Sequence, residues 1–344
     1  MSRVFVTGAG GFVGSRLVRR LEAACLQVTA LSRSPPAESA ETDVRWVRGD
    51  VTEPDSYRSE LAEADFVVHL AARLTARRVE DYELANVTGT ARLLETCADR
   101  CPKLRRVVVV STVAAMGPRR DGKLLRETDP CAPASAYGAS KLAAEQRALD
   151  LASRLPITIL RPVFVYGPGD ARGAGYLDAW LRSPPGAWES PIRTLSLVHV
   201  DDFVLACERA LSSDVDSGTI ILVAAPASCD WVDVRGSVAG ALAWLGSEGR
   251  IEPELAHRFV RRIEALDPAG ERRAAEADAR RPTGPPDGSR RRKGTPLEWW
   301  GCDTGRARRL LGFEHTRTLA DGTRQTLSSY ASAGLFDAAN WGAA

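Results

Sequence analysis

Short β-branched runs alternate with longer amphipathic segments over roughly the first half of the chain, and this alternation constrains the fold more than any other feature. It is typical of a parallel β-sheet with helices on both faces, because parallel strands need long crossover connections. The runs predict strands at residues 3–7, 27–31, 44–48, 66–70, 106–111 and 157–161, and helices at residues 12–24, 80–100 and 136–154. Since such crossovers are right-handed, we expect an α/β fold with a doubly wound parallel sheet.

The second half of the chain has a looser pattern. The elements predicted there are turns at residues 167–169 and 183–186, a strand at 195–199 and a helix at 201–211. We therefore expect a larger domain over residues 1–170 and a smaller, mixed C-terminal lid over residues 171–344, partly interleaved with the first. The segment 268–294, rich in Arg, Ala, Pro and Gly, is expected to be an exposed loop. Its basic run at 290–293 lacks interleaved aromatic residues and is expected to be solvated surface.

Composition narrows the range of partners. The 46 basic and 44 acidic side chains nearly cancel, so the net charge of +2 gives no general attraction for nucleic acid or an anionic membrane. Neither a run of about eighteen apolar residues nor a signal-like start is found, and we expect a cytoplasmic protein without a membrane span. Seven cysteines without a CxxC pair indicate buried thiols in a reducing compartment. Four histidines without ligand spacing argue against a metal centre.

A glycine-rich loop joins the first predicted strand to the first predicted helix. Its glycines are Gly8, Gly11 and Gly14. This spacing permits a tight turn, close approach of the backbone to a pyrophosphate, and close packing of helix on strand. The free N–H groups and the positive end of the helix dipole then face the phosphates. Since the strand, loop and helix context is the one the motif requires, we expect a dinucleotide-binding Rossmann domain, with Phe12 and Val13 also at the cofactor.

The ends of the next strands indicate which dinucleotide is preferred. NAD is usually held by a carboxylate at the end of the second strand, whereas the 2′-phosphate of NADP needs a cation. That strand ends in Arg33 without an acidic residue, so we predict NADP, with NAD as the alternative if Arg33 is one surface arginine among many. A carboxylate after the third strand can accept a hydrogen bond from adenine, and small residues after the fourth let a cofactor lie across the strand end. The residues predicted at these two positions are Asp50, Val51, Leu70, Ala71 and Ala72.

Tyr137 and Lys141 carry the predicted chemistry. They lie four residues apart on one face of a predicted helix. A phenol with its ordinary pKa of about 10 is a poor proton shuttle at neutral pH, but a nearby ammonium stabilises the phenolate and lowers that pKa. The pair would then serve as a general acid or base for a carbonyl or carbinol oxygen, and a hydroxyl of Ser111 or Thr112 would hold that oxygen. The alternative is a surface tyrosine and lysine without a catalytic role.

These motifs resemble those of the extended short-chain dehydrogenase/reductase family, also called the NAD-dependent epimerase/dehydratase family, and most of all its 3β-hydroxysteroid dehydrogenase-like and dihydroflavonol reductase-like members. The resemblance covers roughly residues 3–225, with a weaker similarity at 303–313. Its segments are 7–14, Asp50, 69–72, 86–90, 111–112 with Gly117, 137–141, 161–162, 166–169 and 198–202.

The resemblance also implies roles for single residues. It implies that Tyr137 is the acid/base, that Lys141 lowers its pKa and binds the nicotinamide ribose, and that Thr112 takes the position of the family's catalytic Ser or Thr. Asn86 looks like the family's structural asparagine. The further cofactor contacts that it implies are Ser111, Pro162 and Val165.

One departure from the family pattern bears on the substrate. Many sugar-nucleotide members carry an Asn where this chain has Phe164, which favours a less polar ketone or secondary alcohol. The aromatic residues Tyr176, Trp180 and Trp188 would either line an apolar pocket or form the core of the lid.

Three hypotheses follow from these observations. The first is an NADPH-dependent ketone reductase or secondary alcohol dehydrogenase, an enzyme that takes a small-molecule carbonyl or alcohol. The second is a nucleotide-sugar epimerase or dehydratase with tightly held NAD(P), and the third is a dinucleotide sensor without turnover. The resemblance also implies a homodimer.

Overall fold

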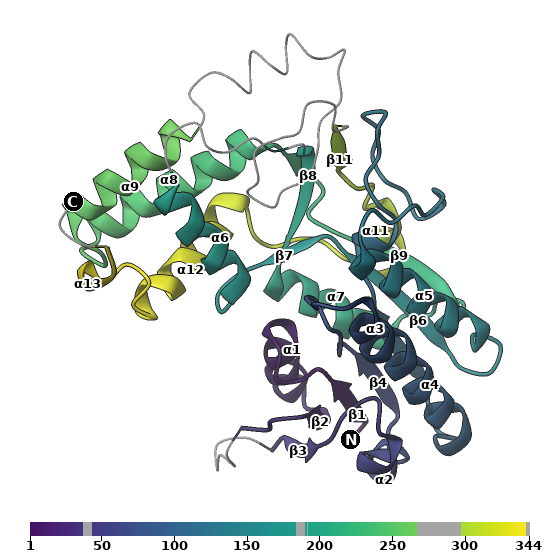
Figure 1. Cartoon of the computed structure of the whole chain (residues 1–344). Coiled ribbons are helices and arrows are strands. Elements are labelled where there is room, and N and C mark those ends of the chain that lie inside the picture. Colours follow the sequence, from purple (N-terminus) through teal and green to yellow (C-terminus); the bar gives the residue numbers. More distant parts are fainter. Residues whose placement is uncertain (37–42, 184–189, 191, 267–296, 342–344) are drawn as a thin grey trace.

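The computed structural model describes residues 1–36, 43–183, 190, 192–266 and 297–341 (Figure 1). Trp188 and the predicted loop at 268–294, with its basic run, lie outside the described residues.

Seven parallel strands form the main sheet, which confirms the predicted doubly wound α/β fold. They are β1 (Arg3–Thr7), β2 (Gln27–Ser32), β3 (Arg45–Arg48), β4 (Phe66–His69), β5 (Arg106–Val110), β6 (Ile157–Pro162) and β9 (Thr219–Val223). Their order is β3-β2-β1-β4-β5-β6-β9, and every pairing in it is parallel. The order reverses between β1 and β4, and ligands of such sheets bind beyond the carboxyl ends of the strands at this reversal.

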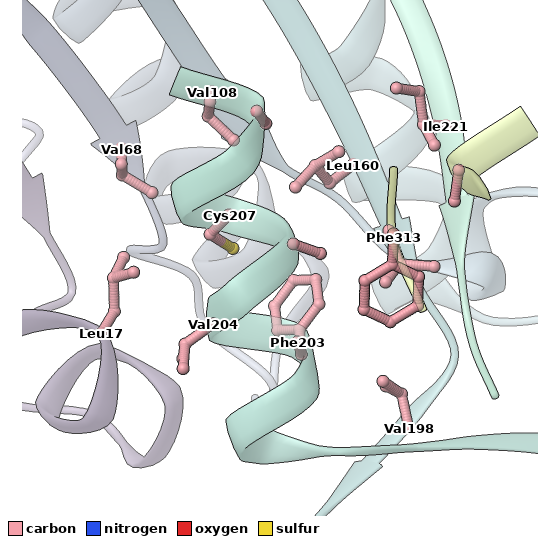
Figure 2. Packing of buried hydrophobic residues seen from close by; sticks show 14 of the residues in the cluster. Leu17, Val68, Val108, Leu160, Val198, Phe203, Val204, Cys207, Ile221 and Phe313 are labelled. Atoms are coloured by element: carbon pink, nitrogen blue, oxygen red, sulfur yellow. The ribbon is translucent and has the colours of Figure 1, made fainter. Parts of the chain in front are cut away.

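Helices cover both faces of this sheet because successive residues of its strands are apolar and point to opposite faces. Val4 and Val6 of β1 face one apolar cluster, whereas Phe5 faces the other. The first cluster packs against α1 (Phe12–Ala23) and α7 (Val200–Ser212), as Figure 2 shows. The helices on the second face are α2 (Arg58–Leu61), α4 (Gly89–Arg100) and α5 (Ala136–Asp150).

Two helices differ from the sequence prediction. The segment predicted as one helix over 80–100 consists of α3 (Val79–Tyr82), a π-helical turn (Glu83–Thr88) and α4. The π turn brings the Asn86 side chain to the backbone of Arg73, a tertiary contact that hydrophobic periodicity does not encode. Helix α5 ends at Asp150, earlier than predicted, and turns follow it. The seventh strand, β9, was not predicted and extends the main sheet well beyond residue 170.

A second, smaller sheet leads into a group of helices. Its strands are β7 (Phe164–Tyr166), β8 (Ile192–His199), β10 (Ser228–Cys229) and β11 (Glu298–Trp300). The helices are α6 (Ala171–Arg182), α8 (Trp231–Ser247), α9 (Pro253–Ala265), α12 (Leu319–Ser332) and α13 (Ala338–Trp341). Helix α11 (Gly305–Leu311) instead packs against the main sheet, where Ala307 and Leu311 belong to the first apolar cluster. Figure 1 shows α6, α8, α9 and α12 gathered on the far side of β7 and β8 from the main sheet. Their shared apolar cluster is a third core.

The predicted lid aromatics have different environments. Trp180 is buried edge-on against Trp231 at a centroid distance of 5.5 Å and belongs to the third core. Tyr176 on the same helix is 51% exposed.

Within the described ranges, no helix is long and apolar enough to cross a membrane. The same residues contain no cluster of His, Cys, Asp and Glu that could hold a metal ion. All seven cysteines are free thiols, and four of them are buried.

Candidate active site

The glycine loop between β1 and α1 has no room for a side chain at Gly8 or Gly14. Gly8 has a φ of +69°, and a Cβ on it would lie 2.6 Å from the backbone nitrogen of Ala71. A Cβ on Gly14 would lie 2.1 Å from the carbonyl oxygen of Gly8. Gly11 caps α1 without a side-chain hydrogen bond, so the first turn presents backbone N–H groups to a ligand. The residues therefore fit a dinucleotide pyrophosphate, because the loop forms a cradle that larger side chains would fill.

Two arginines lie where β2 and β3 end. Arg33 is exposed, and its carbonyl oxygen accepts a hydrogen bond of 3.1 Å from the Arg48 guanidinium. A Cβ on Gly10 would lie 3.0 Å from Ser32 Oγ, so the end of β2 lies against the glycine loop. Arg48 was not predicted from the sequence, although its place at the end of a predicted strand beside the strand that precedes Arg33 was the available signal.

Asp50 and the end of β4 lie along the same edge of the sheet. The Oδ1 atom of Asp50 accepts hydrogen bonds from the backbone N–H and the hydroxyl of Thr52, at 2.9 and 2.8 Å, which fixes the carboxylate. Val51 is buried beneath it. Of the residues after β4, Leu70 and Ala71 are partly buried and Ala72 is exposed.

Close packing places Tyr137 beside Thr112. A Cβ on Gly138 would lie 2.3 Å from the carbonyl oxygen of Ala114, so α5 begins in direct contact with the 3₁₀ turn Val113–Ala115 that follows β5. Ser135 caps α5 through a 3.0 Å hydrogen bond from the Gly138 N–H. The Thr112 side chain lies near enough to the Tyr137 phenol to lower the pKa of that phenol.

Burial dominates the electrostatics of the Tyr137 and Lys141 pair. Desolvation raises the pKa of Tyr137 to about 12, although the charge of Arg172 and the nearby Thr112 side chain lower it. Lys141 is almost fully buried, its Nζ donates a 2.9 Å hydrogen bond to the carbonyl of Val110, and burial lowers its pKa to about 8. The predicted lowering of the Tyr137 pKa is therefore not found, because the cost of burying a phenolate exceeds the stabilisation by nearby charge.

The two adjacent hydroxyls after β5 have different partners. Ser111 is buried and donates a hydrogen bond to Glu145, whereas Thr112 is partly exposed. Glu145 in turn pairs with Arg161, with Nε–Oε1 and Nη2–Oε2 distances of 2.9 and 2.5 Å. This buried ion pair was not predicted from the sequence, and its signal was a carboxylate four residues after Lys141 on the same helix face.

Asn86 and Tyr82 fasten the segment after β4 beside Tyr137. Asn86 accepts a 2.7 Å hydrogen bond from the Arg73 N–H and donates to the Arg73 carbonyl and to Ser140 Oγ, at 3.1 and 2.9 Å. Tyr82, also missed from sequence, accepts a 3.0 Å hydrogen bond from the Ala76 N–H. Its ring centroid lies 6.3 Å from that of Tyr137.

The segment after β6 contributes an aromatic side chain. Phe164 is 41% exposed, and its ring meets Trp300 edge-on at 6.2 Å. Pro162 is buried at the end of β6, and Val165 pairs with Val198 of β8.

The sequence of this chain is similar to those of known proteins. The sequence profile of the NAD dependent epimerase/dehydratase family matches residues 4–224. A 2-alkyl-3-oxoalkanoate reductase of Shewanella oneidensis is 32% identical over 49% of this chain and 46% of its own length, so this chain spans about half of that relative. A dTDP-6-deoxy-L-talose 4-dehydrogenase (NAD(P)(+)) of Kitasatospora kifunensis is 30% identical over 96% of each protein.

Among solved structures, the UDP-glucuronic acid 4-epimerase of Bacillus cereus in complex with NAD shares the fold, with a TM-score of 0.69 at 21% identity over 96% of this chain and 99% of that one. The family match covers more than half of the chain and includes the glycine loop, Thr112, Tyr137 and Lys141. This chain therefore belongs to the NAD dependent epimerase/dehydratase family, the extended short-chain dehydrogenase/reductase enzymes, which comprise NAD(P)-dependent oxidoreductases and epimerases.

Proposed function

We propose that this chain is an NADPH-dependent ketone reductase, or the corresponding secondary alcohol dehydrogenase, for a relatively apolar small molecule. The observation that carries the proposal is the Tyr137 phenol next to Thr112, on the same helix as the buried Lys141, at the carboxyl end of β5. This group of side chains can hold a carbonyl oxygen and supply a proton to it.

In the proposed mechanism, the nicotinamide supplies the hydride when bound. Tyr137 donates its phenolic proton to the oxygen that develops negative charge, and the Thr112 hydroxyl orients that oxygen. The raised pKa of Tyr137 supports this direction, because the phenol keeps its proton at neutral pH. Lys141 would hold the nicotinamide ribose and, as an ammonium, would stabilise the phenolate that remains.

The proposed preference for NADPH rests on the ends of β2 and β3. Arg33, which follows β2, and Arg48, which ends β3, each carry a guanidinium group, and no acidic residue follows β2 directly. A 2′-phosphate is well held by such groups, whereas the ribose hydroxyls of NAD usually meet a carboxylate. The glycine loop would hold the pyrophosphate, with the adenine end near Asp50 and Val51 and the nicotinamide end near residues 70–72 and Val165.

The proposed substrate region begins after residue 170. In this division residues 1–170 bind the cofactor and residues 171–344 supply most of the substrate contacts. The exposed ring of Phe164, backed by Trp300, supports a substrate with an apolar face. The name of the Shewanella oneidensis relative, a reductase of 2-alkyl-3-oxoalkanoates, supports the same class of reaction.

A second candidate function is interconversion or dehydration of a nucleotide-sugar with a tightly held cofactor. It is favoured by the dTDP-6-deoxy-L-talose 4-dehydrogenase, because that similarity covers 96% of both proteins. Cofactor that co-purifies and is regenerated, together with binding of a nucleoside diphosphate, would distinguish this function from the first.

The proposal is tested by titrating the purified chain with NADPH and NADH and then following NADPH oxidation over a panel of carbonyl compounds. We expect tighter binding of NADPH and turnover of an apolar ketone. Equal or tighter binding of NADH would overturn the cofactor assignment, and cofactor oxidation confined to nucleotide-sugars would overturn the substrate class.

The cellular setting is also proposed. The four buried free thiols support a reducing compartment such as the cytoplasm. The homodimer implied by the family resemblance is tested by the mass of the protein in solution.

A further inference from the structure

His69 is a buried histidine to which the proposed chemistry assigns no role. It ends β4, and its side chain is fully shielded from solvent. Its Nδ1 lies 2.7 Å from Thr7 Oγ1, and its Nε2 lies 2.8 Å from Thr90 Oγ1. Thr7 ends β1 beside the glycine loop, and Thr90 belongs to α4. The ring therefore joins the cofactor edge of the sheet to a helix on one face.

The neighbouring hydrogen bonds fix the direction of both contacts. The Thr90 hydroxyl donates its single proton to the carbonyl of Asn86 at 2.6 Å, so it accepts from His69, whose Nε2 carries the ring proton. Burial and the Lys141 charge lower the pKa of His69 to about 3, so the ring is neutral and Nδ1 is an acceptor. Thr7 therefore donates to Nδ1, and its oxygen accepts from the Ala71 N–H at 3.2 Å.

The path continues to the helix that carries Tyr137. The Asn86 side chain donates to Ser140 Oγ at 2.9 Å. Ser140 in turn donates to the Tyr137 carbonyl at 2.8 Å. The two halves of this path meet covalently in Asn86, whose backbone carbonyl accepts from Thr90 and whose side-chain amide donates to Ser140. In both halves every donor points the same way, from Ala71 at the glycine loop to the first turn of α5. Breaking one link leaves a buried polar group unsatisfied, which favours a shift of the elements on either side.

We propose that His69 and Thr90 are positioning residues, which hold the Tyr137 end of α5 in register with the cofactor edge formed by Thr7 and Ala71 through one directed hydrogen-bond path. The expected effect of these residues on turnover rests on the proposed reductase function. The directed hydrogen-bond path does not depend on that function. Neither residue touches the reacting groups, so the expected effect is on the chemical step more than on cofactor affinity.

The first experiment uses ¹⁵N-histidine NMR of the whole chain, which contains four histidines. We expect one histidine in the Nε2–H tautomer that does not titrate between about pH 5 and pH 9, and whose single tautomer is lost in Thr90→Val. Assignment by His69→Asn identifies the signal. A wild-type His69 protonated on Nδ1, or one that titrates near pH 6, would overturn the proposal.

The second experiment compares turnover in matched variants. Thr326 of α12 is the control, because its buried hydroxyl also donates to the carbonyl four residues earlier, at 2.6 Å from Gly322 O. With the carbonyl substrate found by the panel, we expect Thr90→Val to lower kcat about tenfold while the NADPH Kd changes less than about threefold. Thr90→Ser should restore most of kcat, and Thr326→Val should leave kcat unchanged.

Equal kcat in Thr90→Val and Thr326→Val would overturn the positioning role, and so would a failure of Thr90→Ser to restore kcat. If the wild-type chain bound neither dinucleotide, the proposed function would fail, while the NMR result would still decide on the directed path.

Discussion

The carboxyl edge of the main sheet and the helical region of this molecule are held together by different kinds of contact. At the carboxyl edge of the main sheet, backbone atoms meet so closely that Gly8 and Gly138 cannot carry a side chain, and buried polar groups form directed hydrogen bonds. The helices α6, α8, α9 and α12 are joined instead by an apolar cluster that includes Leu242 and Phe259. Apolar packing tolerates many residue choices, whereas directed contacts tolerate few. Chemistry is therefore expected in the first region and substrate adaptation in the second.

The largest expected difference between the regions concerns two tyrosines, the partly buried Tyr137 and the buried Tyr330. Tyr137→Phe removes the proposed proton donor, and kcat should fall about 1,000-fold with NADPH binding retained. Tyr330 of α12 donates a 2.8 Å hydrogen bond to the carbonyl of Asp170, so Tyr330→Phe should cost about 1 kcal/mol of folding free energy and leave kcat within about threefold. Steady-state kinetics and urea denaturation measure both effects. Similar kcat values for the two variants would remove the distinction between the regions.

A smaller contrast is expected for ion pairs. Arg161→Met leaves the buried carboxylate of Glu145 without its cation, which should lower the free energy of unfolding by about 3–5 kcal/mol. Arg324→Met breaks a pair with Asp321 in α12 in which both side chains are about half exposed, and should cost less than about 1 kcal/mol. Urea denaturation of both variants gives the comparison, and losses of equal size would show that burial does not set the strength of these pairs.

The smallest expected effect is on pH dependence. The pKa of Lys141 is lowered to about 8, so its ammonium loses its proton as the pH rises through that value, while the Tyr137 phenol, with a pKa of about 12, stays protonated. In the reductive direction kcat/KM should be constant below about pH 7 and fall about fivefold between pH 8 and pH 9. Lys141→Arg should move this decline to higher pH. A decline at the same pH in that variant would assign it to another group.

The sheet region could be predicted well from the sequence, because the backbone geometry of this region restricts which residue types fit at particular positions. The glycine loop and the Tyr137 and Lys141 spacing are visible since few other residues fit those positions. The π-helical turn inside the predicted helix over 80–100 was missed because the hydrogen bonds between Asn86 and the Arg73 backbone that accompany it join residues through the fold. The raised pKa of Tyr137 was missed for a similar reason, since desolvation depends on packing that no local pattern contains.

The helical region was less predictable. The sequence was equally consistent with Trp180 lining a pocket or lying in the core of the lid. Its packing against Trp231 in the structure shows that it lies in the core. Strand β9 joins the main sheet beside β6 although about sixty residues separate the two strands, a pairing set by long-range topology. In contrast, Glu145 and Arg161 are charged residues at otherwise apolar positions of the sequence, so their ion pair could have been predicted.

The most direct test of the proposed reaction follows the hydride itself. The chain is incubated with NADPH deuterated at the transferable C4 position and with the ketone found by the panel, and the product is analysed by mass spectrometry. We predict one deuterium on the carbinol carbon for each NADPH oxidised, and almost no product with Tyr137→Phe. A product without deuterium, formed while the NADPH concentration stays constant, would contradict the reductase function.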